Sequence, residues 1–443
     1  MSDVLVVGGG LAGCEAAWQL ADAGLSVTLC EMRPLLTTGA HTTDCLAEVV
    51  CSNSFGSESE TTAPGILKTE LALAGSLLLT CAQEVRVPAG GALAVDRDLF
   101  AALVTERISS HPRISVRREE VTDVPSCPAI LATGPLTSPT LARILRERLG
   151  DEGVAFFDAV APIVTRESID MSRAYVAGRY GRGNDYINCP LDEEEYQVFY
   201  ETLKEAERVT PHDFEGGASC FEGCMPIEVL AERGLDTLRF GPMKPVGLPD
   251  PRTGREPHAV VQLRQDNREG TLYNLVGFQT GLRWPAQARL IRTIPGLESA
   301  EVVRYGVMHR NTSVNAPAVL DPHLRPRALK RPDLFLAGQV TGVEGYMEST
   351  AMGLVAGLGL AAVLDGREPP VWPRETAIGS LLHYLQSADP ATFQPMNVNL
   401  GLFPPLERRV RDRKKRAAAH ATRAERVLRS FLGLPDLQTS HMP

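Results

Sequence analysis

Three glycines near the start of the chain have the spacing of a phosphate-binding turn. Gly8, Gly10 and Gly13 form G-x-G-x-x-G directly after the apolar residues 4–7. In such a turn the first glycine permits the tight bend, the second lets the backbone approach a pyrophosphate, and the third lets a helix pack closely on a strand. Glu31 follows at the distance at which an acid accepts hydrogen bonds from ribose hydroxyls. These residues predict a dinucleotide site.

The pattern around the turn predicts the elements that must position it. Residues 4–7 and 26–31 are apolar runs typical of strands, and residues 14–23 repeat apolar positions at helical spacing. A helix that starts behind the glycines aims its free N–H groups and its positive dipole end at the phosphates. This unit argues against a glycine-rich turn that merely packs tightly, but it does not distinguish flavin, nicotinamide and S-adenosylmethionine.

A second set of glycines lies far along the chain and favours flavin. Residues 332–339 predict a strand that ends in Gly338-Gln339, and an Ala- and Leu-rich helix follows through residue 362. This pattern resembles the second fingerprint of two-dinucleotide-domain flavoproteins, which usually carry Asp at the position of Gln339, and residues 130–134 resemble their Ala-Thr-Gly strand end. We therefore predict a Rossmann-like α/β domain that binds FAD through Gly8, Gly10, Leu11, Ala12, Gly13, Glu31, Met32, Arg33, Gly134, Gly338, Gln339, Gly342 and Gly345.

Composition excludes several broad classes of protein. The chain has 443 residues, 44% of them hydrophobic, which indicates a folded protein with ample material for a core. A net charge of −9 argues against a generally basic nucleic-acid binder. The longest charge-free apolar stretch, residues 353–364, is shorter than a membrane-spanning helix needs. With nine cysteines, no secretory signal and no metal-ligand spacing, we expect free thiols in the cytoplasm and no metal site.

The middle of the chain loses the alternation of strands and helices. Asp192 is placed to cap a helix with Tyr196, Phe199 and Leu203 on one face, and the proline-rich residues 241–258 predict a loop. No second G-x-G-x-x-G indicates a separate nicotinamide domain. We expect a discontinuous FAD-binding domain over residues 1–155 and 305–443, with an inserted α+β domain over residues 156–304.

Several longer motifs resemble one enzyme family along nearly the whole chain. They occupy residues 31–34, 40–44, 47–54, 221–228, 305–312, 338–348 and 393–405. Together they are similar to the folate- and FAD-dependent tRNA (uracil-5-)-methyltransferases, which make ribothymidine at uridine 54 of the tRNA T-loop. The chain departs from this pattern at Phe55-Gly56, where we expect the family to carry a basic residue.

The resemblance implies a methylene group taken from 5,10-methylenetetrahydrofolate and two electrons that NADH or NADPH supplies through FAD. Uracil C5 becomes nucleophilic only after a group such as a thiolate adds at C6, and the C5 proton must then leave to a base. By resemblance Cys224 is the nucleophile and Cys51 assists, or the two roles are exchanged. Cys14, Cys30, Cys45, Cys81 and Cys127 are expected to be buried small hydrophobes, and Cys220 could pair with Cys224 after oxidation.

Two further sites follow from the resemblance. His309 is expected to stack on the pterin of the folate, although a structural histidine is nearly as good an interpretation. Residues 407–429 carry ten basic and three acidic side chains, which could be a solvated face or a phosphate-binding surface. Given an RNA substrate, we predict tRNA contacts on two helical turns at Arg408, Arg409, Arg411, Arg413, Lys414, Lys415 and Arg416.

Three alternatives remain open at this stage. A flavin oxidoreductase of a small metabolite would leave the basic C-terminal run without a role. A non-catalytic flavin- or RNA-binding module would leave Cys51 and Cys224 without one. The larger flavoprotein that modifies wobble uridine shares the opening of the chain but has an additional C-terminal helical domain.

Overall fold

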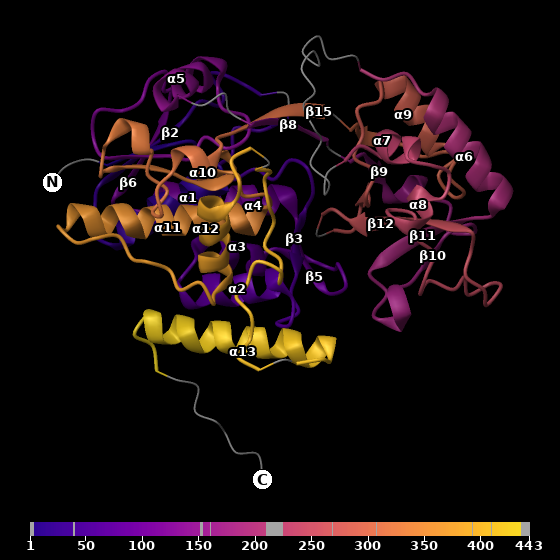
Figure 1. Cartoon of the computed structure of the whole chain (residues 1–443). Coiled ribbons are helices and arrows are strands. Elements are labelled where there is room, and N and C mark those ends of the chain that lie inside the picture. Colours follow the sequence, from indigo (N-terminus) through magenta and orange to yellow (C-terminus); the bar gives the residue numbers. More distant parts are fainter. Residues whose placement is uncertain are drawn as a thin grey trace.

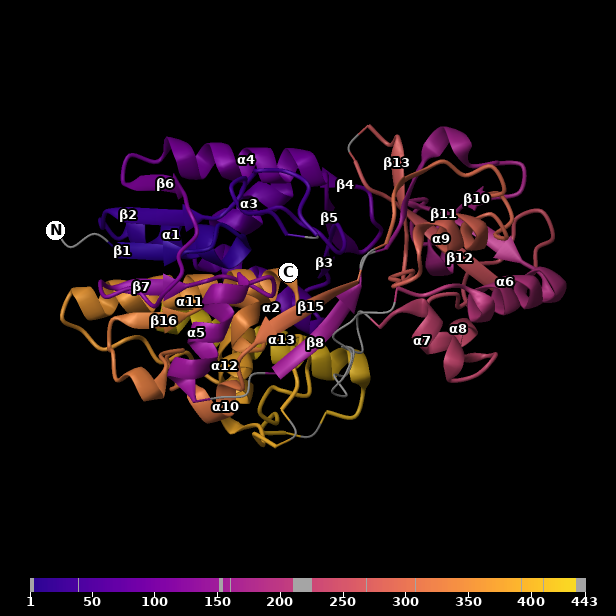
Figure 2. The same ribbon diagram turned by 90° about the horizontal axis from the view of Figure 1, so that it is seen from above.

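The computed structural model describes residues 4–38, 40–150, 154–159, 161–209, 225–267, 269–306, 308–391, 393–408 and 410–435. A five-stranded parallel sheet, in the order β16-β7-β1-β2-β6, organises the larger part of the chain (Figures 1 and 2). Its strands are β1 (Val4–Val7), β2 (Val27–Glu31), β6 (Ile114–Arg118), β7 (Ala129–Leu131) and β16 (Leu334–Leu336). The two predicted fingerprints therefore meet in one sheet, because β16 pairs with β7 beside β1.

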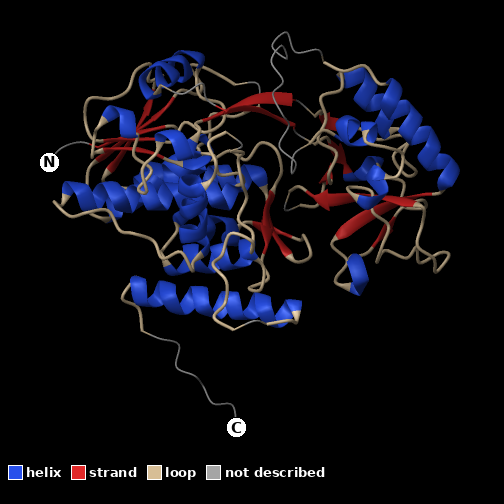
Figure 3. Ribbon diagram, viewed as in Figure 1, coloured by secondary structure: helices blue, strands red, loops and turns tan. Residues whose placement is uncertain are grey.

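Helices cover this sheet on both sides. In Figure 1, α5 (Pro139–Leu149) lies above the sheet, and α1 (Leu11–Asp22) and α11 (Tyr346–Leu364) lie below it. The remaining helices of this domain are α2 (Ala63–Leu73), α3 (Leu77–Glu84), α4 (Arg97–Ser110), α10 (Ala316–Val319), α12 (Ala377–Ser387) and α13 (Arg413–Phe431). Figure 3 shows α13 as the outermost layer at the lower face.

The helix α11 is apolar around its whole circumference because it lies inside the protein. Among the described residues it is the single continuous helix long and apolar enough to cross a membrane, but 72% of its apolar window is buried. It packs along α1 at unusually short range, since a Cβ placed on Gly353 would lie 2.2 Å from the carbonyl oxygen of Ala12. An all-round apolar helix is what a core position requires.

The inserted domain has its own sheet and its own core. Six strands pair in the order β10-β11-β12-β13-β9-β14, and all of the pairings are antiparallel. The strands are β9 (Ile163–Thr165), β10 (Tyr175–Val176), β11 (Tyr186–Leu191), β12 (Ala259–Gln265), β13 (Leu272–Leu275) and β14 (Val302–Arg304). The helices α6 (Glu193–Glu205), α7 (Ile227–Glu232), α8 (Thr237–Phe240) and α9 (Trp284–Ile291) accompany them, and the hydrophobic core of this domain is separate from that of the larger domain.

Two antiparallel strands carry the chain out to the inserted domain and back. These are β8 (Val154–Ala159) and β15 (Met308–Ser313), and they lie side by side between the two domains in Figure 2. A third small sheet, β3 (Ser54–Ser57), β5 (Ala92–Val95) and β4 (Arg86–Val87), faces the inserted domain from the other side. The expected α/β class with an inserted domain is confirmed, while the domain boundaries stay a prediction that falls inside β8 and just after β14.

Local predictions agree well with the elements of the structure. Asp192 caps α6 in a capping box with Glu195, and Tyr196, Phe199 and Leu203 are buried on one face, as expected. Residues 241–258 contain no helix or strand. The first helix begins at Leu11, earlier than the predicted residue 14, because Gly10 serves as its N-cap.

Candidate active site

A cavity runs along the carboxyl ends of β1, β2 and β7. It holds about 990 Å³ of empty space, the solvent at its mouth included. Ligands of open α/β sheets bind in this crevice because the turns after the strands converge there. Four segments of the N-terminal third of the chain line it: Val7–Ala12; Cys30–Arg33, followed by His41, Glu48 and Val50; Glu119–Val121; and Ala132–Ser138, followed by Leu141. The second fingerprint and the helix after it contribute Gln339, Tyr346 and Ser349.

The glycine turn has the geometry that its spacing predicts. Gly8 has a φ of +104°, and a Cβ there would lie 2.4 Å from the carbonyl oxygen of Ala132. A Cβ on Gly13 would lie 1.8 Å from the carbonyl oxygen of Gly8, so these two positions exclude any side chain. Gly10 differs, because no protein atom lies within 4 Å of its Cβ position and it faces the cavity. A pyrophosphate fits this open cradle at the N-terminus of α1, where backbone N–H groups are free.

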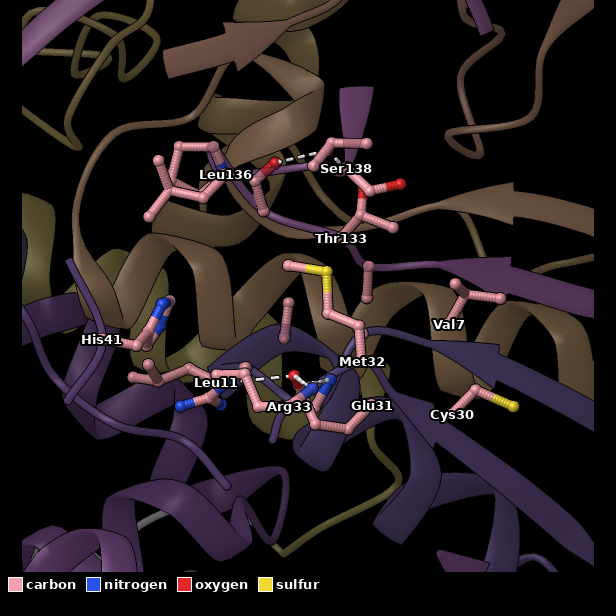
Figure 4. A pocket seen from close by; sticks show the side chains of 18 of the residues that line it. Val7, Leu11, Cys30, Glu31, Met32, Arg33, His41, Thr133, Leu136 and Ser138 are labelled. Atoms are coloured by element: carbon pink, nitrogen blue, oxygen red, sulfur yellow. Dashed lines mark hydrogen bonds and ion pairs between the residues drawn. The ribbon is translucent and has the colours of Figure 1, made fainter. Parts of the chain in front are cut away.

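A buried charge network forms the floor of the cavity beside this turn. Glu31 accepts from the Gly9 N–H through Oε2, at 2.9 Å, and from the Arg33 N–H and guanidinium through Oε1, at 2.9 and 3.0 Å. Burial raises the pKa of Glu31, but the charge and hydrogen bonds of Arg33 outweigh it, so the pKa lies below its ordinary value. In Figure 4 this pair lies below Met32, with Thr133, Leu136 and Ser138 on the opposite wall. The acid is therefore ionised and held at the cavity, as ribose recognition requires.

Glu48 extends the network and was not among the predicted site residues. Arg33 donates to its carboxylate at 2.9 Å, and the backbone and hydroxyl groups of Thr42 and Thr43 donate as well. Burial raises the pKa of Glu48, but these hydrogen bonds and the charge of His41 outweigh burial, so the pKa of Glu48 lies below its ordinary value. The motif around residues 40–48 was visible in the sequence, but spacing could not show that it folds around one carboxylate.

The second fingerprint closes the cavity from the other side. Gly338 has a φ of +78°, and a Cβ there would lie 2.6 Å from the Cβ of Ala12. Gln339 lines the cavity and donates its amide to both carboxylate oxygens of Glu344 at 2.8 Å. Gly342 and Gly345 were expected at the cofactor, but they do not line the cavity. Gly342 instead packs on Phe393, and Gly345 is the N-cap of α11.

Cys51 lies beside the cavity, next to the lining residues Val50 and Tyr346. The Tyr346 hydroxyl is 3.0 Å from the Cys51 sulfur, and it accepts from the backbone N–H groups of Cys51 and Ser52 at 3.0 and 3.3 Å. Because these two bonds fill the lone pairs of the hydroxyl oxygen, its hydrogen points to the sulfur. Burial and then the neighbouring Cys51 raise the pKa of Tyr346 well above its usual value. This hydroxyl therefore remains a donor that stabilises a thiolate on Cys51.

The Cys51 segment is held between the two domains. Arg97 donates to the Asp266 carboxylate at 3.0 Å and to the carbonyl oxygens of Val49 and Val50 at 2.9 and 3.1 Å. Arg264 of β12 donates to Asn53 at 3.0 Å. Both arginines are buried, so residues 49–53 occupy a fixed position at the domain junction.

Other predicted residues fall partly or wholly outside the described residues. Cys220, Cys224 and Arg409 are outside them, and only the backbone of His309 is described, where it pairs with Asp158 between β15 and β8. The chain bonds to one short segment on both sides of residues 210–224, since Val209 N–H donates to Gly281 and Ile227 N–H donates to Gln279. The described residues Val209 and Ile227 are therefore both held by the segment 279–281.

Burial distinguishes the remaining cysteines. Cys14, Cys30 and Cys81 are buried, as predicted, and burial raises the pKa of Cys30 to about 12 and of Cys81 to about 11. The same prediction is wrong for Cys127, which is exposed, and for Cys45, which is half-buried. Neither Cys45 nor Cys127 lies in a continuous apolar run of the sequence, so the residue type alone could not predict how exposed these two side chains are. Within the described part of the chain no three His, Cys, Asp or Glu side chains gather as a metal site.

The departure at Phe55-Gly56 has a structural counterpart. Phe55 is buried against the rings of Phe100 and Tyr346, with centroids 5.2 and 5.4 Å apart. The Nζ of Lys68 lies 3.8 Å from the position that a Cβ on Gly56 would take. A cation thus occupies the space beside Gly56, and burial lowers the pKa of Lys68 to about 8.

The basic C-terminal residues are split between a loop and a helix. The prediction of two helical turns is wrong for Arg408 and Arg411, which precede α13, since Asp412 caps that helix at Lys415. Arg408, Arg411, Lys414, Lys415 and Arg416 are exposed, and the side chain of Arg413 is not described. Ala417, His420, Ala424 and Leu428 form the buried face of α13. Cations at a helix N-terminus interact unfavourably with the helix dipole, so these side chains do not stabilise α13. Their placement instead favours the binding of an anionic partner.

Comparison with known proteins agrees with this architecture. A family model described as glucose inhibited division protein A matches residues 3–368. The chain is 60% identical over 432 residues to the methylenetetrahydrofolate–tRNA-(uracil-5-)-methyltransferase TrmFO of Desulforudis audaxviator, covering 97% of this chain and 98% of that protein. It is 56% identical to the protein of the same name from Anoxybacillus flavithermus, covering 97% and 99%.

Among solved structures the chain is similar to Aquifex aeolicus GidA, with a TM-score of 0.67 at 18% identity. That match covers 98% of this chain and 74% of GidA, and it bears on the fold alone. The high identity over nearly full length is decisive for the family. The chain belongs to the TrmFO family of methylenetetrahydrofolate–tRNA-(uracil-5-)-methyltransferases, within the wider glucose inhibited division protein A family.

Proposed function

We propose that this protein methylates C5 of uridine 54 in the T-loop of tRNA, with 5,10-methylenetetrahydrofolate as one-carbon donor and NADH or NADPH as reductant. The observation that supports this most directly is Cys51 beside a dinucleotide cavity, with its sulfur 3.0 Å from a hydroxyl that donates to it. A tRNA-modifying enzyme of this kind would act in the cytoplasm.

The overall reaction constrains what the protein must do. The uracil C5–H is replaced by C5–CH3, and methylenetetrahydrofolate gives up its CH2 group and becomes tetrahydrofolate. Once bonded to C5, the methylene carbon needs one hydride, that is two electrons and one hydrogen, to become a methyl group, and NAD(P)H supplies this hydride equivalent. The C5 proton and one proton from solvent go to the two folate nitrogens that the methylene group leaves. When bound, FAD carries those electrons between the nicotinamide and the one-carbon unit.

The described residues divide the work of holding FAD and preparing the base. The glycine turn and Glu31 fit the pyrophosphate and the ribose, and Thr133, Gly134 and Gln339 line the remainder of the cavity. Cys224 adds to C6 and later leaves, while Cys51 takes the proton from C5 or exchanges roles with Cys224. The Tyr346 hydroxyl, 3.0 Å from the Cys51 sulfur, favours the thiolate that either role requires. His309 stacks on the pterin in this proposal.

The substrate reaches the site across a surface that contains the exposed cations before and at the start of α13. Arg408, Arg411, Lys414, Lys415 and Arg416 can neutralise phosphates there. Because the chain as a whole carries a net charge of −9, this local positive charge determines where RNA can approach.

The decisive experiment supplies purified holoenzyme with unmodified tRNA, methylenetetrahydrofolate and NAD(P)H, then digests the RNA for mass spectrometry. We expect 5-methyluridine at position 54 and none in a tRNA with cytidine at that position. Modification at the wobble position would support the wider-family alternative. Flavin turnover on a small metabolite without RNA, or a product that needs S-adenosylmethionine, would overturn the proposal.

A further inference from the structure

An exposed aromatic pair lies at one edge of the inserted sheet. The rings of Trp284 and Tyr305 are stacked, with centroids 5.5 Å apart and planes within 11° of parallel. Trp284 is 60% exposed although it is the first residue of α9. The other two tryptophans differ, since Trp18 is half-buried and Trp372 is buried. Because tryptophan is enriched among the residues that dominate binding interfaces, this exposed indole is a candidate contact for a partner.

The pair is held in place by a buried amide. Gln287 is 1% exposed, and its side chain bonds both the N–H and the carbonyl of Gly306, at 2.7 and 2.8 Å. It also donates to the carbonyl of Leu282 at 2.6 Å. These bonds fix the residues on either side of Trp284 and the residue after Tyr305. The stacked arrangement is therefore pre-organised and loses little conformational entropy when a third ring joins it.

The chain segment that carries Trp284 is positively charged. Residues 283–297 contain Arg283, Arg289 and Arg292 and no acidic residue, and all three arginines are exposed. Arg283 approaches Glu207 only at 4.0 Å, in a pair that is mostly in solvent. A flat aromatic face with the exposed Arg283 next to it in the chain matches an unpaired nucleotide, which offers a base to stack and a phosphate to neutralise.

The pair also lies close to the proposed active site. Arg304, the residue before Tyr305, donates to the carbonyl of Ala40 at 3.1 Å, next to the cavity-lining His41. Trp284 also follows the segment 279–281, whose carbonyl groups accept hydrogen bonds from Val209 and Ile227. The strand end that carries Tyr305 is thus joined to the segment beside the cavity.

We propose that Trp284, supported by Tyr305, is a stacking platform for an unpaired nucleobase of the RNA substrate, next to the uridine that enters the active site. This inference rests on the proposed function for the identity of the RNA. It adds a binding site that recognises the single-stranded character of the loop, because a base must be unpaired to expose its face.

The test compares four full-length holoenzymes, namely wild type, Trp284→Ala, Trp284→Phe and Tyr180→Ala. Tyr180 is a matched control, because it is 65% exposed and follows β10, the edge strand opposite β14. Fluorescence anisotropy with a fluorescein-labelled, unmodified T-arm hairpin gives Kd. We expect Trp284→Ala to raise Kd about tenfold or more, the range found when a stacking aromatic is removed, and Trp284→Phe and Tyr180→Ala to stay within about threefold of wild type.

A second measurement separates this site from its alternatives. The loss in Trp284→Ala should vanish for a fully paired duplex of the same length, and the KM for NAD(P)H in flavin reduction should not change. An unchanged hairpin Kd in Trp284→Ala would overturn the platform, as would a rise in the KM for NAD(P)H with RNA binding intact. If wild type binds the hairpin but makes no 5-methyluridine, the proposed function fails while the hairpin comparison still decides the platform.

Discussion

Arg97 and Asp266 form a buried ion pair across the domain junction, with the guanidinium Nε 3.0 Å from both carboxylate oxygens. The same arginine holds the two carbonyls that precede Cys51. An ion pair so far from solvent contributes little net stability, but loss of one partner leaves an uncompensated charge. Its value to the protein is therefore positional, since it ties the Cys51 segment of one domain to a strand end of the other.

Asp266→Asn should be strongly destabilising because Arg97 would keep its charge without a counter-ion. We expect a loss of about 3 kcal/mol in the free energy of unfolding. Methylation should fall while bound FAD remains, because neither residue lines the cavity. Thermal unfolding, flavin absorbance and 5-methyluridine yield measure these effects. The control is Arg143→Ala, which breaks an exposed pair with Glu147 and should change stability by about 0.5 kcal/mol or less. Equal effects of both substitutions would contradict a special role of the junction.

Cys51→Ala and Cys224→Ala should each abolish methylation and leave the flavin spectrum intact. Wild-type turnover by either variant would remove that cysteine from the mechanism. Tyr346→Phe should retain FAD but lose the hydrogen bond to the Cys51 sulfur. Because the thiolate is then less favoured, the rate should fall about 10-fold or more at neutral pH and recover partly as the pH rises. A pH–rate profile that keeps its wild-type shape would argue against this donor role.

Gly10→Val and Gly13→Ala should fail in different ways. Gly10 has a negative φ and open space at its Cβ position, so Gly10→Val should fold with a nearly unchanged melting temperature and purify without flavin. Gly13 has the Gly8 carbonyl 1.8 Å from its Cβ position, so even alanine there should destabilise the fold. Absorbance near the flavin bands and a melting curve distinguish the two. A yellow Gly10→Val protein would show that no cofactor approaches this turn.

Substitution of Lys414, Lys415 and Arg416 by alanine should weaken tRNA binding uniformly and leave NAD(P)H-dependent flavin reduction unchanged. Each lost phosphate contact should reduce the slope of log K against log salt by about 0.9 for a duplex contact. Titrations of tRNA at several salt concentrations provide this slope. Binding by wild type that does not depend on salt would exclude a phosphate-binding role for these residues.

Stability should decrease as the pH rises from about 4.5 to 7, because two buried carboxyls hold protons in the folded state. Burial raises the pKa of both Glu70 and Glu348 to about 7, against an ordinary 4.5. Since the folded state then binds more protons than the unfolded one, each group opposes folding by up to about 3 kcal/mol above pH 7. Glu70→Gln should flatten the pH dependence in this window, and Glu147→Gln, on the surface, should not. A steeper dependence in Glu70→Gln would contradict this sign.

The sequence predicted the parts of the site that depend on local rules. The glycine turn and the second fingerprint follow from steric demands that act within a few residues, so spacing reveals them. Glu48, Arg97 and the Arg264–Asn53 contact could not be predicted, because they join segments that only the folded chain brings together. The packing of Gly342 on Phe393 could not be predicted for the same reason, since Phe393 comes from a distant segment.

The absence of side chains at Gly353 and Gly357 has a consequence for how the enzyme handles several ligands. Their backbones lie directly against Ala12 and Ala16 of α1, so the two helices have no compressible layer between them. The glycine turn before α1 and the cavity-lining first turn of α11, at Tyr346 and Ser349, therefore keep one separation whatever occupies the cavity. Any change of shape that accommodates folate, nicotinamide or RNA must then occur in other parts of the molecule, because the cradle itself is rigid.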